Sequence, residues 1–232
     1  MQIDIESRPS YGMAVVTLTQ GQSILAESGS MVAMSDAVTV ETRFSGTGSG
    51  GFWGWLRAAL TSLARMLLAG ESMFVNHFTA TGDGQQVMLA PEMVGDVEQI
   101  PIDKGREITV QSTSFLASGP KVSVAMVWAG LRMILSKEGA FFLRCSGQGP
   151  LLINSYGAIE KIEVDGAYIV DTGHLVAFEG DLTWEIEKVG GWKSTLLSGE
   201  GLVMRFHGKG TLWLQTRNFQ SLISWLTPQL PQ

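Results

Sequence analysis

The sequence predicts an all-β protein: three internal repeats of antiparallel strands in a barrel-like or sandwich arrangement with pseudo-threefold symmetry. Two sequence phrases each recur three times, and a repeated module of this size buries too little surface to fold alone. Glycine is abundant, at 28 of 232 residues. Val, Ile, Phe and Trp occur in short runs, which is typical of strands joined by tight turns. We therefore expect one repeat-built domain over residues 1–232.

The first phrase predicts the same local structure at three places. It reads as a polar or acidic residue, two small residues, a polar residue, and then two apolar residues followed by alanine. Its copies occupy residues 27–34, 111–118 and 171–178. Each copy runs from small polar residues into an apolar run, so a strand is expected at the end of each phrase.

The second phrase predicts a strand, a glycine-containing turn and a further strand. It begins at Glu71, Glu138 and Glu200, each followed by an apolar run. The turns are expected at residues 82–84, 147–149 and 208–210. The two phrases together define modules of about 24–100, 108–164 and 168–217.

The first module carries an insertion. The separation between the two phrases is 44 residues in the first copy, from residue 27 to 71, against 27 and 29 residues in the other copies. The additional residues fall in a glycine-rich and helical segment of about 45–68. Apolar residues recur there at helical spacing, which predicts an amphipathic helix over 52–68.

This inserted helix is the candidate interaction surface. No acidic residue occurs between Glu41 and Glu71, whereas arginines do. The helix could lie on its own sheet, against a partner protein or on a membrane surface, and the sequence leaves these alternatives open. The candidate residues are Phe52, Trp53, Trp55, Leu56, Arg57, Leu60, Leu63 and Arg65.

The glycines at the start of the insertion imitate a dinucleotide fingerprint. Gly46, Gly48 and Gly51 have its spacing, and Glu71 lies 20 residues beyond the last of them. However, Glu71 has counterparts in the other repeats, and the rest of the chain lacks the alternation of strands and helices of a dinucleotide-binding fold. We therefore expect no bound dinucleotide and no other cofactor.

A short C-terminal helix is expected over residues 219–226. Phe219, Leu222, Ile223 and Leu226 fall on one face, and the pair Thr227-Pro228 ends the helix. Its expected role is to cover an otherwise open end of the sheet.

Nothing in the sequence predicts a catalytic or metal site. His77, His174 and His207 fall in different phases of the repeat, and none has a second histidine or cysteine at metal-ligand spacing. Cys145 lies in an apolar run and is expected to be a buried structural thiol. A net charge of −6 disfavours binding to nucleic acid. No signal peptide or transmembrane run is expected, so the predicted location is cytoplasmic, with a possible peripheral association with a membrane.

The segment 168–178, together with 193–195, 198–203 and 214–217, resembles a widespread bacterial family of uncharacterised proteins. The resemblance extends over nearly the whole chain. A mitochondrial relative in this family is the "altered inheritance of mitochondria" protein. The resemblance implies a fold like the tryptophan RNA-binding attenuation protein (TRAP-like) and, for the mitochondrial relative, a role in inner-membrane organisation and respiratory biogenesis. It implies no catalytic residues.

The leading functional hypothesis is a non-enzymatic assembly or membrane-associated scaffold protein that self-associates as an oligomer. It could also bind a protein partner or the membrane surface. The alternative hypothesis is a small-ligand or RNA-binding module, and an enzyme of unrecognised chemistry ranks third.

Overall fold

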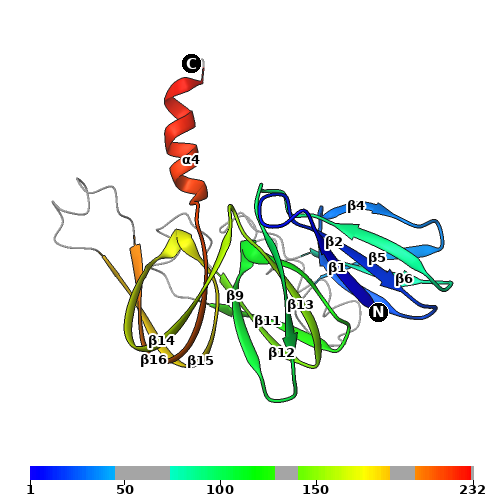
Figure 1. Cartoon of the computed structure of the whole chain (residues 1–232), viewed down its shortest axis with the longest axis horizontal. Helices are drawn as coiled ribbons and strands as arrows, with labels where there is room; N and C mark the ends of the chain where they lie inside the picture. Colours follow the sequence, from blue (N-terminus) through cyan, green and yellow to red (C-terminus); the bar gives the residue numbers. More distant parts are fainter. Residues whose placement is uncertain (45–73, 129–140, 189–201, 231–232) are drawn as a thin grey trace, which may run out of the picture.

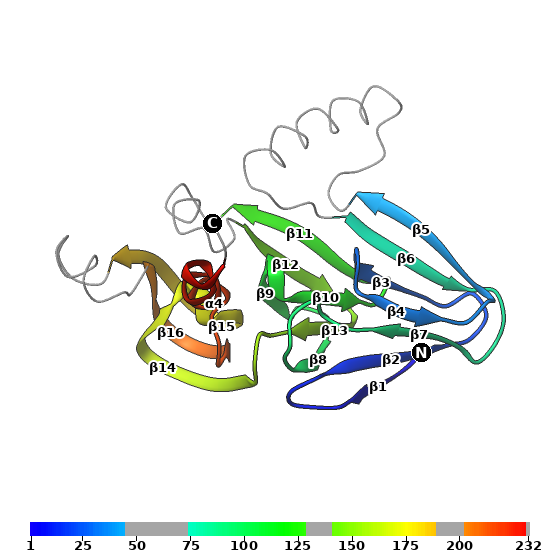
Figure 2. The ribbon, with the colours of Figure 1, turned by 90° about the horizontal axis from the view of Figure 1, so that it is seen from above.

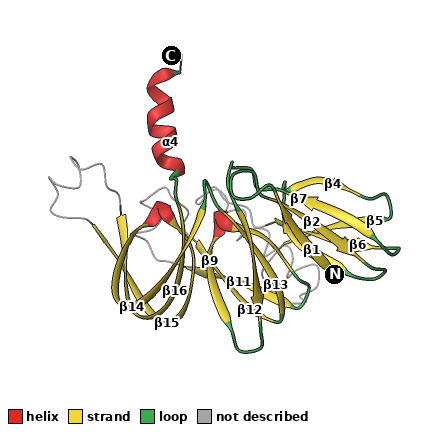
Figure 3. Ribbon diagram, viewed as in Figure 1, coloured by secondary structure: helices red, strands yellow, loops and turns green. Residues whose placement is uncertain are grey.

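The computed structural model describes residues 1–44, 74–128, 141–188 and 202–230 (Figure 1). The inserted segment at 45–68 and the three glutamates that open the second phrase lie outside these residues. The described chain is mostly strand, with a short α-helix, α4 (Phe219–Leu226), near its C-terminus (Figure 3). The predicted all-β class and the C-terminal helix are therefore confirmed.

The strands fall into three consecutive units, with β1 (Gln2–Glu6) preceding the first. Unit 1 contains β2 (Met13–Leu18), β3 (Ser23–Glu27), β4 (Met31–Met34), β5 (Val38–Phe44), β6 (Phe74–Ala80) and β7 (Gln85–Leu89). Unit 2 contains β8 (Val97–Ile102), β9 (Glu107–Gln111), β10 (Phe115–Ser118), β11 (Val122–Trp128), β12 (Phe141–Gly147) and β13 (Gly149–Asn154). Unit 3 contains the long strands β14 (Ile159–Asp171), β15 (Leu175–Lys188) and β16 (Leu202–Gln215).

The three units repeat one antiparallel pairing scheme. In unit 1, β7 lies between β2 and β4, and β6 lies between β3 and β5. In unit 2, β13 lies between β8 and β10, and β12 lies between β9 and β11. In unit 3, β16 pairs with β14 on one side and with β15 on the other along nearly its whole length. Units 1 and 2 begin one strand earlier than the predicted modules, and the third predicted module begins at residue 168, within the first strand of unit 3. The pseudo-threefold symmetry stays a prediction.

The copies of the first phrase adopt one local structure. Each begins at the last residue of a strand, passes through three residues and enters the next strand, from β3 to β4, from β9 to β10 and from β14 to β15. In the second and third copies the three residues form the 3₁₀ turns η1 (Ser112–Ser114) and η2 (Thr172–His174). The predicted strands at the ends of the phrases are confirmed.

At two of the three predicted glycine turns the chain bends but does not reverse its direction. Only Gln148 separates β12 from β13, and β16 runs through residues 208–210 without interruption. A Cβ atom on Gly147 would lie 2.3 Å from the carbonyl oxygen of Lys121, and one on Gly208 would lie 2.1 Å from that of Asp181. These glycines therefore allow two backbones to approach closely where a strand bends, and the prediction of turns at these two sites is wrong.

Neighbouring units are joined by continuous sheets. Strand β3 of unit 1 pairs with β10 of unit 2, and β9 of unit 2 pairs with β15 of unit 3. The resulting six-stranded sheets have the orders β5-β6-β3-β10-β13-β8 and β11-β12-β9-β15-β16-β14. The units therefore lie in a row, with β4 near one end and β14 at the other (Figures 1 and 2).

Each junction also places side chains of one unit in the core of the unit before it. Leu116 of β10 belongs to the apolar cluster of unit 1, with Val16 and Leu89. Val176 of β15 belongs to the cluster of unit 2, with Ile108 and other residues of that unit. One side of unit 1 is therefore covered by β10 of unit 2, and one side of unit 2 by β15 of unit 3.

The loop after β1 is attached to the start of unit 2 by an ion pair. Arg8 donates from Nε and Nη2 to the two carboxylate oxygens of Asp96, at 2.8 and 2.9 Å. The Asp96 side chain is 2% exposed, and its Oδ1 also accepts a hydrogen bond from the backbone N–H of Val97. Arg8 therefore supplies the partner charge of a buried carboxylate.

Replacing Arg8 with alanine is expected to lower the free energy of unfolding by about 2 kcal/mol, because the Asp96 carboxylate would remain buried without its cation. The matched control is Arg144→Ala, since Arg144 pairs with Glu107 and both side chains are 50% exposed. The control is expected to cost less than about 1 kcal/mol. Urea unfolding of both variants measures the difference, and equal losses would contradict it.

The C-terminal helix stands apart from the sheets (Figure 1). It begins at Asn218, whose side-chain oxygen accepts from the backbone N–H groups of Gln220 and Ser221. None of its residues is buried, and Trp225 is 66% exposed. The expectation that this helix covers the end of the sheet is therefore wrong, because the capped helix starts directly after β16 and leads away from it. In the described part of the chain, no helix has both the length and the apolar character needed to cross a bilayer.

Candidate functional site

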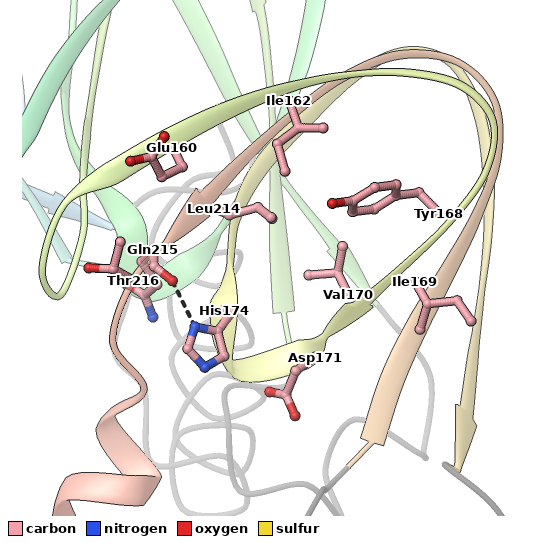
Figure 4. Close-up of a pocket in the computed structure, with 10 residues that line it drawn as sticks. All are labelled: Glu160, Ile162, Tyr168, Ile169, Val170, Asp171, His174, Leu214, Gln215 and Thr216. Carbon is pink, nitrogen blue, oxygen red and sulfur yellow. Dashed lines mark hydrogen bonds between the residues drawn. The ribbon is translucent and has the colours of Figure 1, made fainter.

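The candidate functional site is an open hollow of about 380 Å³ on unit 3, lined by both halves of the curved strand β14 and by the end of β16 (Figure 4). Its apolar floor is formed by Ile162, Val170 and Leu214, and Tyr168 and Ile169 lie on β14 at its side. Glu160, Asp171, His174 and Gln215 form its polar part. The hollow lies on the last of the three described units of the row.

The apolar floor has buried counterparts in unit 2. The pairing registers place Ile162, Val170 and Leu214 at the positions of Ile100, Val110 and Ile153. Those three residues are at most 3% exposed and belong to one apolar cluster with Val176 and Ala177 of β15. In unit 3, Val170 is also buried, at 4% exposed, whereas Ile162 and Leu214 are only half-buried. In unit 2, strand β15 of the following unit fills the corresponding space, and in unit 3 this space is the hollow.

The polar groups of the hollow are engaged in holding the corner between β14 and β15. His174 Nδ1 lies 2.7 Å from the carbonyl oxygen of Gln215, which can only accept, so the ring nitrogen donates. The Gln215 side chain donates to the carbonyl of Gly173 at 2.8 Å and accepts from the backbone N–H of Tyr156 at 2.8 Å. Asp171 Oδ1 accepts from the backbone N–H of Gly173 at 2.9 Å. These bonds fix the η2 turn and the end of β16.

A second exposed edge lies at the opposite end of the row. All four residues of β4 are exposed, including Met31 at 43%, Val32 at 57% and Met34 at 41%. The four residues at the same positions of the phrase in β10 are buried, and so are those at the start of β15. Strand β4 therefore has the apolar sequence of a junction strand, and among the described strands it pairs with β7 alone.

Nothing else in the described residues indicates a reactive site. No group of three or more His, Cys, Asp or Glu side chains within the described ranges could hold a metal ion. Cys145 is fully buried, and burial raises the pKa of its thiol to about 12. Cys145 is thus a structural thiol, as predicted from the apolar run that contains it.

The interaction surface predicted from the sequence lies outside the described residues. This applies to all of its members: Phe52, Trp53, Trp55, Leu56, Arg57, Leu60, Leu63 and Arg65. The hollow and the β4 edge were not predicted from the sequence. The signal that could have found them is the repeat itself, because a row of units that close one another leaves its first and last strands open.

Three comparisons place the chain among known proteins. The family model described as "Mitochondrial biogenesis AIM24" matches residues 3–217. An uncharacterized protein from Streptococcus pyogenes serotype M6 is 29% identical over 234 residues, which cover 100% of this chain and 92% of the relative. A crystal structure of a protein from Streptococcus pyogenes superposes with a TM-score of 0.80 and 26% identity, covering 99% of each chain. The predicted likeness to the tryptophan RNA-binding attenuation protein stays a prediction.

Proposed function

This chain belongs to the mitochondrial biogenesis AIM24 family, and on that premise we propose that it is a non-enzymatic assembly protein that works by adding strands at its open edges. The observation that carries the proposal is the pair of unmatched junction edges, β4 at one end of the row and the second half of β14 at the other. Both are edge strands that carry exposed apolar side chains.

An uncovered edge strand favours the addition of another strand. It offers unpaired backbone N–H and C=O groups, and natural proteins usually protect such edges with charge, proline or a covering segment. Strand β1, the opposite edge of the sheet that contains β4, carries Asp4 and Glu6. Strand β4 has the sequence Met-Val-Ala-Met and carries no charge. The contrast supports β4, rather than β1, as the edge that accepts a partner.

The hydrogen bonds of the hollow hold the corner between β14 and β15. His174 Nδ1 donates to the carbonyl of Gln215, and Asp171 Oδ1 accepts from the backbone N–H of Gly173. We assign these two atoms a structural role, and the proposal requires no catalytic role for either residue.

Small-ligand binding is the second candidate function. The volume of the hollow, about 380 Å³, lies in the usual range of small-molecule pockets, and its floor is apolar. A ligand bound there would compete with strand addition, so a small apolar ligand should dissociate assemblies. RNA binding is disfavoured because the charged residues of the hollow, Glu160 and Asp171, are acidic.

Self-association tests the proposed function. Sedimentation velocity of the full chain over a wide range of concentration is expected to show species heavier than the monomer, whose proportion rises with concentration. Flotation with anionic liposomes, measured in parallel, tests the membrane-associated form of the proposal, which depends on the inserted helix. A single monomeric species at all concentrations, without liposome binding, would overturn the assembly function.

A further inference from the structure

We propose that copies of this chain associate head to tail through one defined strand pair. In this pair, β4 of one copy lies antiparallel to the second half of β14 of the next, with Ala33 opposite Val170 and Met34 opposite Ile169. The inference rests on the proposed function and deepens it, because it names the partner as a second copy and fixes the register.

The register is taken from the two junctions inside the chain. At the first junction, Ala117 pairs with Ala26 and Ser118 with Leu25. At the second, Ala177 pairs with Val110 and Phe178 with Thr109. Both junctions follow one rule. The alanine of one copy of the first phrase lies opposite the residue that comes just before the previous copy. Thus Ala117 lies opposite Ala26, which precedes Glu27, and Ala177 lies opposite Val110, which precedes Gln111.

Applied once more, the same rule gives the proposed contact. The third copy of the phrase opens at Asp171, so the residue before it is Val170. The alanine of the first copy is Ala33. Pairing Ala33 with Val170 therefore continues the row of units with the register of both internal junctions.

The side chains at the two edges are complementary. At the internal junctions the residue before the alanine is Leu116 or Val176; both are 0% exposed and belong to the core of the preceding unit. The corresponding residue of β4 is Val32, which is 57% exposed. The hollow offers Ile162 and Leu214 at the positions that cover Val176 within unit 2. Val32 of one copy therefore fits the open core of unit 3 in the next.

The pair must form between copies. Strands β4 and β14 belong to different units at opposite ends of the row, as both views of the ribbon show (Figures 1 and 2). Because the two surfaces differ, the contact is heterologous, and it extends into a ring or a filament according to the rotation between copies.

Cysteine pairing between two variants tests the register. Met34→Cys and Ile169→Cys are prepared as separate proteins, mixed, and oxidised. Direct partners in antiparallel strands have Cβ atoms about 4.5–5.5 Å apart, which is close enough for a disulfide after a small adjustment. The expected product is a disulfide-linked dimer that forms in the mixture and not in either variant alone. Native Cys145 does not compete, since it is buried and its thiol has a pKa raised to about 12.

The matched control places the cysteine on the other edge of the same sheet. Gln2→Cys on β1, mixed with Ile169→Cys, is expected to give no dimer above background. A disulfide in Met34→Cys alone would mean that β4 pairs with itself, and would overturn the head-to-tail contact. Self-association of the wild type without cross-linking in the mixture would overturn the contact while leaving the proposed function in place. A monomeric wild type would overturn both.

A charge placed in the contact provides a second measurement. Val32→Asp is expected to weaken self-association by at least about a hundredfold, because the carboxylate would have to enter the apolar hollow. Val40→Asp on β5 is the control, since Val40 is 41% exposed and lies outside the proposed contact. Both variants should keep the thermal unfolding of the monomer, because both positions are exposed. Unchanged association of Val32→Asp would contradict the proposal.

Discussion

Replacing Gly95 with alanine is expected to lower the free energy of unfolding by about 3 kcal/mol or more, through a clash of backbone with backbone. A Cβ atom at this position would lie 1.8 Å from the carbonyl oxygen of Ser155 and 2.8 Å from that of Gly157. The segment cannot easily move away. The Gly95 carbonyl accepts from Gly12 N at 2.8 Å, and Asp96 N donates to Gly157 O at 2.9 Å.

The matched control for this change is Gly82→Ala. A Cβ atom on Gly82 would meet Gln85 Nε2 at 3.6 Å, an ordinary contact with the end of a flexible side chain. This variant is expected to change the free energy of unfolding by no more than about 0.5 kcal/mol. Urea unfolding followed by circular dichroism measures both. Similar urea midpoints for Gly95→Ala and Gly82→Ala would show that the backbone at Gly95 can move away from Ser155 and Gly157, contrary to the expectation.

The repeat made much of the fold predictable. The phrases that open at Glu27, Gln111 and Asp171 mark the three corners at which one strand ends and the next begins. They could be found because the corner requires small polar residues and the following strand requires apolar ones, and both requirements act locally. The capped C-terminal helix was predictable for the same reason, since Asn218 and Pro228 are local signals.

Features that depend on distant contacts could not be predicted. Gly208 has the sequence of a turn glycine, but its conformation follows from the close approach of Asp181 on another strand. Met31-Val32-Ala33-Met34 and Phe115-Leu116-Ala117-Ser118 are similar in sequence, yet the first is exposed and the second is buried. The difference is the presence of a preceding unit, which no local pattern records.

The candidate site illustrates the same limit. Val170 and Val110 occupy equivalent positions before the corner, and only the pairing of β9 with β15 distinguishes a covered edge from an open one. Sequence reasoning favoured the inserted helix at 52–68 because an amphipathic period is visible locally. An open sheet edge has no such period, so it becomes visible only when the order of the strands is known.

Trp213 is the side chain whose loss is expected to have the largest effect on the core. It lies on β16 of unit 3, is 1% exposed, and packs in the apolar cluster that contains Ile108 and Leu151 of unit 2. Its Nε1–H donates to Glu98 Oε1 at 3.1 Å, and Lys161 Nζ lies 5.6 Å from the ring centroid. The ring therefore joins the core of unit 2 to the strands of unit 3.

Trp213→Ala is expected to lower the free energy of unfolding by about 3–5 kcal/mol, because it leaves a cavity where two units meet. Trp213→Phe keeps most of the apolar volume and loses the hydrogen bond to Glu98, so a loss of about 1 kcal/mol is expected. Trp225→Ala on the exposed helix α4 is the matched control and should change stability by no more than about 0.5 kcal/mol. Urea unfolding of the three variants beside the wild type provides the measurement. If Trp213→Ala unfolded in two separate steps while the wild type unfolded in one, the ring would be the link that makes units 2 and 3 cooperative. If Trp213→Ala and Trp225→Ala were equally stable, the core assigned to Trp213 would be wrong.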